Sequence, residues 1–307
     1  MTFVRRGDAQ TLQAQPKPAG RSTTRTLHRL LRQPAFLVGS AITCAFVILA
    51  VAAPLLAPHD PSAPLLLDQV RAQANPVPGP QEGFVLGGDA AGRDLLSRLL
   101  VGARQTLIVG VLATLGGLVG GAALGILAGV FAGKVDTFVM RVVDVMLAIP
   151  SLLMAFSIAA LFARPNEWTL IIAIAVVQIP VFARLMRGSM LVQRGTDHVL
   201  AARALGVRPG AIVFRHMVPN AMGPVIVQGT LSLAVSILDA AALSFLGLGN
   251  PDDAQPEWGQ MLGGAQQHFN SYPHLAIYPA LCIIVVALGF TLAGESLRET
   301  LDPRTRR

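Results

Sequence analysis

Between two long apolar segments the chain reads Asp197-His-Val-Leu-Ala-Ala-Arg-Ala-Leu-Gly206 and then Val-Arg-Pro-Gly-Ala-Ile-Val-Phe-Arg-His-Met-Val-Pro219. Six arginines lie from Arg184 to Arg215 around this polar insert. A bilayer interior has no water to solvate charges or free backbone groups, so the insert cannot lie within it. We therefore expect a structured loop on one face of a membrane, and its elaborate sequence favours contact with a partner.

The insert, taken as residues 185–220, is predicted to form two short helices. Ala201 belongs to an apolar, helix-favouring stretch that Gly206 can end as a left-handed cap. Pro209 suits the first turn of a second helix, and Pro219 marks the return into the next apolar segment.

The composition places the chain in a membrane. Of its 307 residues 53% are hydrophobic and only 13% are charged, whereas soluble proteins carry about 25% charged residues. The net charge of +7 does not indicate nucleic-acid binding, because the arginines are spread among loops and no basic-aromatic platform accompanies them.

Six apolar segments are close to the length that a membrane-spanning helix needs, so we expect an all-α polytopic membrane protein. They cover residues 35–56, 105–133, 138–163, 168–183, 221–250 and 275–294. With the N-terminus in the cytoplasm, the inner segments hold 19 of the 24 lysines and arginines and the outer segments hold 5. This bias predicts that both termini are cytoplasmic.

The predicted organisation follows from these spans. A cytoplasmic arm is followed by the first span, an external segment, a five-helix core with the insert, and a cytoplasmic tail: residues 1–34, 35–56, 57–104, 105–296 and 297–307. The first span could instead be a signal peptide, because Ala50-Val51-Ala52 resembles a cleavage site. Both the arm and the apolar run are long for a signal peptide, which favours an uncleaved span.

The sequence predicts no catalytic residue, cofactor or metal site. Cys44 and Cys282 lie in apolar runs without the spacing of metal ligands or a disulfide framework. The Gly133-Lys134 pair is not part of a phosphate-binding loop, because Ala128 stands where the first glycine is needed.

A glycine recurs at every fourth position of the second apolar segment, which predicts a groove for close approach of another helix. The stripe comprises Gly117, Gly121, Gly125, Gly129 and Gly133. Static packing is the favoured interpretation, and a surface on which helices slide during transport is the alternative.

The external segment is predicted to end in a helix at the membrane interface, residues 92–104. Its leucines share one helical face, and Asp94 and Arg98 form an i,i+4 pair on the other. Such a helix is either an anchor or a docking surface for an external partner. In the fifth span, Asp239 is the one deep acidic residue, and it faces either a pathway or a packing contact.

The insert resembles the signature loop of the inner-membrane permeases of bacterial ABC importers. That loop reads Glu-Ala-Ala, three residues, Gly, nine residues and Ile-x-Leu-Pro. The matching positions here are Ala201, Ala202, Gly206 and Pro219, while Leu200 replaces the glutamate and Val218 the leucine.

Other motifs resemble the dipeptide/oligopeptide/nickel branch of these permeases, and its subunit type with a long first external segment. They are Leu86 to Arg104, Asp136 to Pro150, Arg203-Ala-Leu-Gly206, Ser244-Phe-Leu-Gly-Leu-Gly249, Trp258-Gly and Leu301-Asp-Pro303. The resemblance covers about residues 35–305.

The resemblance implies a type I importer permease in the bacterial inner membrane. The chain would pair with a second, related permease to form the pore, and its 196–219 insert would dock on one of two cytoplasmic ATPases. An external solute-binding protein would dock near residues 93–104 and the 250–274 loop, at Arg93, Asp94, Arg98 and Trp258. Membrane lipid would surround the chain, and the solute would be a peptide or a relative such as nickel.

A secondary transporter that works without an ATPase is the alternative. The scarcity of intramembrane charge and the lack of a detectable inverted repeat count against it. A membrane enzyme would need a catalytic constellation that the sequence does not offer.

Overall fold

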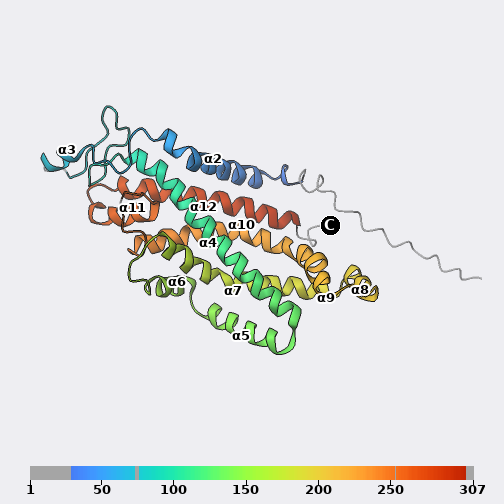
Figure 1. Ribbon diagram of the computed structural model, residues 1–307. Helices are drawn as coiled ribbons and strands as arrows, with labels where there is room; N and C mark the ends of the chain where they lie inside the picture. Colours follow the sequence, from blue (N-terminus) through green and yellow to red (C-terminus); the bar gives the residue numbers. More distant parts are fainter. Residues whose placement is uncertain (1–28, 73–75, 253, 302–307) are drawn as a thin grey trace, which may run out of the picture.

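The computed structural model describes residues 29–72, 76–252 and 254–301, and within these ranges the long elements are all helices. Residues 1–28 of the predicted arm and 302–307 of the predicted tail lie outside the described residues. The elements (Figure 1) are α2 (Pro34–Leu56), α3 (Leu67–Ala72), α4 (Leu95–Phe131), α5 (Gly133–Ala148), α6 (Ser151–Ala159), α7 (Glu167–Arg194), α8 (Asp197–Ala204), α9 (Pro209–Ala211), η1 (Ile212–Met217), α10 (Val218–Phe245), α11 (Trp258–Ala265), η2 (Gln266–His268) and α12 (His274–Leu301).

The prediction of an all-α membrane protein is confirmed. Five helical stretches are long and apolar enough to span a bilayer, and α5 with α6 makes a sixth if the bent pair is one span. Helices α7 and α12 continue past the predicted span ends at residues 183 and 294. The arginine, methionine and glutamate residues that follow are good helix formers, so the helix outlasts the apolar segment.

Helices α2, α4, α7, α10 and α12 lie lengthwise in one bundle (Figure 1). Helices α3 and α11 lie at one end of it, called here the α11 end. Helices α8 and α9 lie at the opposite end, called here the α8 end. The polar insert and the segment that precedes α4 are therefore separated by the length of the bundle.

The third predicted span, residues 138–163, is not one straight helix. Helix α5 ends at Ala148, α6 begins at Ser151, and the two axes differ by 94°. Proline disfavours the helical conformation of the preceding residue, and Ile149, before Pro150, is extended with φ −88° and ψ 130°. A count of apolar residues cannot detect this break.

The predicted interfacial helix at residues 92–104 is not a separate element. Helix α4 runs without interruption from Leu95 to Phe131, 37 residues in all. At about 1.5 Å per residue it is about 55 Å long, against about 30 Å for a hydrocarbon core. One helix therefore includes both the predicted interfacial segment and the second span.

Four glycines of the predicted stripe bring the backbones of α4 and α7 together. A Cβ added at Gly121 would lie 2.5 Å from both the Ile179 carbonyl oxygen and the Phe182 Cβ. One added at Gly125 would lie 2.6 Å from the Ala183 carbonyl oxygen. The contacts of Gly117 and Gly129, with Gln178 and Met190, continue the series at 2.7 and 2.6 Å.

Along this contact the partner residue on α7 advances by four whenever the glycine on α4 advances by four, so the helices run parallel and in register. Four of the five glycines thus pack against α7 in this conformation, and a surface on which the helices slide during transport stays the alternative. Gly133 lies outside this contact, because a Cβ added to its backbone would have nothing within 4 Å, and its φ is +59°. With Ala132 at φ +46°, Gly133 forms the turn from α4 to α5.

The α4–α7 contact generates a stability prediction. Gly121→Ala is expected to lower the unfolding midpoint of the detergent-solubilised protein, because overpacking a tight contact costs about 1–3 kcal/mol. Gly188→Ala on α7 is the matched control, because nothing lies within 4 Å of its added Cβ. Thermal unfolding followed by intrinsic fluorescence measures both, and equal midpoints would contradict the contact.

Candidate functional site

The insert at the α8 end folds as two helices joined by a glycine cap, as predicted. Helix α8 ends at Ala204, and Gly206 has φ +73°. The Gly206 N–H donates to the Arg203 carbonyl at 3.0 Å, and the Val207 N–H donates to the Ala202 carbonyl at 3.1 Å. The second of these bonds, reaching back five residues, is typical of the Schellman motif, which fixes the direction in which the chain leaves α8.

Pro209 is the first residue of α9, as predicted, but Pro219 does not start a new helix. The helical run is continuous from Pro209 to Phe245 through the π-helical segment η1. Proline has no N–H and its ring crowds the carbonyl four residues earlier. The Val218 N–H bonds to the Val213 carbonyl, five residues back, and this wider turn accommodates the proline.

The insert has a buried side and an exposed apolar side. Val199 and Ala202 pack against η1 and the start of α10. Leu200, Leu205 and Phe214, called here the exposed apolar triad, are 48%, 83% and 70% exposed. The sequence analysis missed Leu205 and Phe214, although two short helices cannot bury every apolar residue of the insert.

Three of the six arginines near the insert hold α7 against its neighbours. Arg187 makes a bidentate pair with Asp136 of α5, with both N–O distances 2.6 Å. Arg184 pairs with Asp144 of the same helix at 2.7 Å. Arg194 donates to the Val130 carbonyl at the end of α4. These contacts position the helix from which the insert emerges.

A second site lies at the break between α5 and α6. A cavity of about 470 Å³ is bounded by the break, α7 and α10, and Asp239 lines it. Gln178 lines the same cavity and donates through Nε2 to the Ser236 hydroxyl, which also shares a 2.7 Å hydrogen bond with Thr114. The sequence analysis singled out Asp239 but missed the neutral polar residues beside it.

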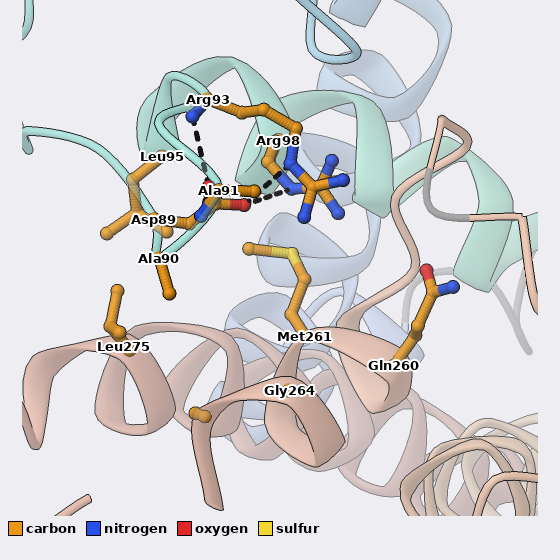
Figure 2. A pocket seen from close by; sticks show the side chains of 11 residues that line it. Asp89, Ala90, Ala91, Arg93, Leu95, Arg98, Gln260, Met261, Gly264 and Leu275 are labelled. Atoms are coloured by element: carbon orange, nitrogen blue, oxygen red, sulfur yellow. Dashed lines mark hydrogen bonds and ion pairs between the residues drawn. The ribbon is translucent and has the colours of Figure 1, made fainter. Parts of the chain in front are cut away.

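A third site is a pocket of about 270 Å³ at the α11 end, between the segment preceding α4 and helices α11 and α12. Figure 2 shows Arg93 and Arg98 converging on the Asp89 carboxylate. The Nε–Oδ2 distances are 2.8 and 3.3 Å, and Arg98 also donates to the Pro61 carbonyl at 3.0 Å. The carboxylate that pairs with Arg98 is thus Asp89, whereas Asp94 caps α4 through Ser97.

Most of the residues predicted to contact an external binding protein are buried. Asp94, Arg98 and Trp258 are 1%, 2% and 3% exposed, so they are structural in this conformation. The Trp258 indole N–H donates to the Leu99 carbonyl at 2.9 Å, and its ring lies 5.5 Å from that of Phe46. The leucine face at residues 92–104 predicted a helix with one side toward the membrane interface. In the structure, other segments of the chain cover this part of α4. Arg93 keeps partial exposure.

Glu257 is a buried carboxyl that the sequence analysis missed. It caps the N-terminus of α11 and accepts a 3.3 Å hydrogen bond from the Gly259 N–H. Burial raises the pKa of Glu257 from its ordinary value of 4.5 to about 7, and the hydrogen bonds that it accepts limit the rise.

Comparison with known families gives two matches. Residues 121–307 match the family described as binding-protein-dependent transport system inner membrane component. Residues 23–76 match the N-terminal TM domain of oligopeptide transport permease C.

Curated relatives align along most of their length. The dipeptide transport system permease protein DppC of Alkalihalophilus pseudofirmus is 39% identical over 88% of this chain and 86% of its own. The di/tripeptide transport system permease protein DppC of Pseudomonas aeruginosa is 40% identical over 85% of both chains. The glutathione transport system permease protein GsiD of Pectobacterium atrosepticum is 36% identical over 91% and 90%.

Two solved structures share the fold. The inward-facing MetNI methionine ABC transporter has a TM-score of 0.53 and 18% identity, over 67% of this chain and 97% of that one. An amino acid ABC transporter crystallised with histidines has a TM-score of 0.52 and 17% identity, over 66% and 94%.

The buried Glu257 carboxyl predicts a pH-dependent stability of the α11 end. Because its folded pKa is about 7 and its ordinary value is 4.5, its stabilisation is present below pH 4.5 and is lost as the pH rises to about 7. In the Glu257→Gln variant the unfolding midpoint should depend less on pH between these two values, because the amide stays neutral. Glu82→Gln, at an exposed position, should leave the wild-type slope unchanged.

Proposed function

The chain belongs to the binding-protein-dependent transport permeases, the inner-membrane components of ABC importers, and from this we propose that it forms half of the pathway of an importer for short peptides. Such a permease works with an ATPase and a substrate-binding protein. We propose a complex of this chain, a second related permease, two ATPases and one binding protein. In this complex the chain performs no covalent chemistry.

The exposed apolar triad carries this proposal. A mobile loop would not hold apolar side chains at fixed exposed positions, whereas the insert is fixed by its Schellman cap and by the buried Val199 and Ala202. Apolar side chains that a fixed loop exposes outside the membrane are suited to a contact with another protein. The ATPase groove that receives this insert would be apolar beside Leu200, where the family has glutamate, so the contact depends on shape more than on charge.

The proposed orientation places the α8 end in the cytoplasm, consistent with the lysine and arginine bias. The α11 end then faces outward, where the binding protein arrives. Arg93 and the 250–274 loop are the proposed contact there, without the buried Asp94, Arg98 and Trp258.

The second permease is proposed to cover α5 and the cavity beside it. Val143 is the one buried residue of α5, while Phe138 and Val145 are 70% and 66% exposed. Because the rest of the chain buries so little of α5, we expect the surface of another subunit to cover it. The cavity at the α5–α6 break is not enclosed by this chain, which suits a pathway between two subunits.

Short peptides are the proposed substrate class, because the relatives above are named for dipeptides, di- and tripeptides and glutathione. The family membership favours an ATP-driven importer over a secondary transporter. Nickel is the alternative solute of the branch that the motifs resemble.

Reconstitution tests the proposed function. The chain alone in lipid vesicles is expected to take up no alanyl-alanine. Vesicles that contain the second permease, the ATPases, the binding protein and ATP should accumulate it. Uptake by the isolated chain would support a secondary transporter, and uptake without ATP hydrolysis by the full complex would contradict an importer.

Gly206→Val tests the coupling role of the insert. A β-branched residue at φ +73° is strained, so the direction of the bend should change. We expect at least about tenfold less uptake, equivalent to about 1.4 kcal/mol of lost coupling, with normal membrane insertion. Gly210→Val is the matched control, because both sites have open space around the added Cβ and Gly210 has no positive φ. Equal uptake by the two variants would contradict this role.

A further inference from the structure

The cavity at the α5–α6 break has the composition of a solute-binding site. Its walls come from residues 146–151 and Met154 at the break, from Val177, Gln178 and Val181 of α7, and from Gln228, Ser232, Val235 and Asp239 of α10. Its volume of about 470 Å³ is within the range of small-molecule sites. An inference about its ligand rests on the proposed function, in which this cavity is one wall of the pathway.

Asp239 gives this cavity its charge. It is the one formally charged residue among the described residues that line the cavity. The nearby arginine of α7, Arg184, is paired with Asp144 of α5. Asp239 makes no hydrogen bond or ion pair with another residue in the described part of the chain. A half-buried carboxylate without a cation favours a ligand that brings one.

Gln178 adds a second, independent indication of a hydrogen-bonding ligand. Its side chain is 5% exposed, and its Nε2 group is already bonded to Ser236. Its Oε1 atom is buried without a partner among the described residues. An amide oxygen left in this state lacks a donor, which a ligand with N–H groups can supply after a small side-chain rotation.

The helix break brings backbone hydrogen-bond acceptors and donors to the same place. The Met146 carbonyl in the last turn of α5 accepts from the Ile149 N–H at 3.3 Å. The other carbonyl groups of that turn and the first N–H groups of α6 have no partner within their own helix, because the ends of a helix leave such groups free. Broken helices at membrane depth line solute sites in this way. A solute with an ammonium group at one end and an acceptor group at the other would therefore find complementary partners.

We propose that this cavity binds the α-ammonium group of a short peptide against the Asp239 carboxylate during its passage, with the Gln178 oxygen accepting from a peptide N–H. Asp239 is then a specificity-determining residue that favours solutes with a free amino terminus. The second permease closes the cavity from the side that this chain leaves open.

The test compares two probes of the same size in vesicles that contain the complete importer. Alanyl-alanine has an ammonium group, and propionyl-alanine is its des-amino analogue. Asp239→Asn should lower alanyl-alanine uptake about tenfold and change propionyl-alanine uptake less than about twofold, as expected for the loss of one charge-assisted contact. Asp239→Glu should retain the preference for the ammonium probe.

Two controls separate this inference from the proposed function. Asp68→Asn removes an exposed carboxylate of α3 outside the cavity and should change neither uptake. ATP hydrolysis stimulated by the loaded binding protein should remain at the wild-type level in Asp239→Asn. An equal loss for both probes, or no loss, would overturn the ammonium site alone. A wild-type importer that hydrolyses ATP but takes up neither probe would overturn the peptide function and this inference together.

Discussion

The backbone contact between α4 and α7 is the constraint on which the other features depend. Gly117, Gly121, Gly125 and Gly129 lack the side chains that would separate the helices, and the two helices run parallel and in register over about three turns. Helix α4 begins at Leu95, directly after its N-cap Asp94 at the α11 end, and α7 ends at Arg194 beside the insert. The pair therefore joins the two ends of the molecule, while Arg184 and Arg187 of α7 add α5 to it.

The two ends of the bundle differ in which side chains they bury and which they expose. At the α11 end, charged and polar side chains turn inward, as in the Asp89–Arg98 pair and the buried Glu257. At the α8 end, apolar side chains turn outward on a rigid frame, as in Leu205 and Phe214. The first arrangement pairs or buries charged groups within the chain, and the second leaves apolar surface exposed.

Local patterns predicted much of the fold, and long-range contacts account for the rest. Apolar runs located the helices, and the residues around Gly206 predicted its cap because that geometry depends on neighbours in sequence. The break at Pro150 was missed because the apolar run at residues 138–163 was treated as one helix. The burial of Trp258 and the Asp89–Arg98 pair depend on segments far apart in sequence, which a single helical face cannot reveal.

The π-helical segment before Pro219 has a mechanical consequence. Because the wider turn absorbs the proline, the chain from Pro209 to Phe245 is one rod of 37 residues and about 55 Å. A tilt of about 5° at its α8 end would displace the far tip by about 5 Å, nearly one helical turn in length. If this helix moves as one body, a small displacement of the insert becomes a larger movement at the far tip, past Asp239. The segment η1 and the interior Pro224 are the points at which it can bend instead.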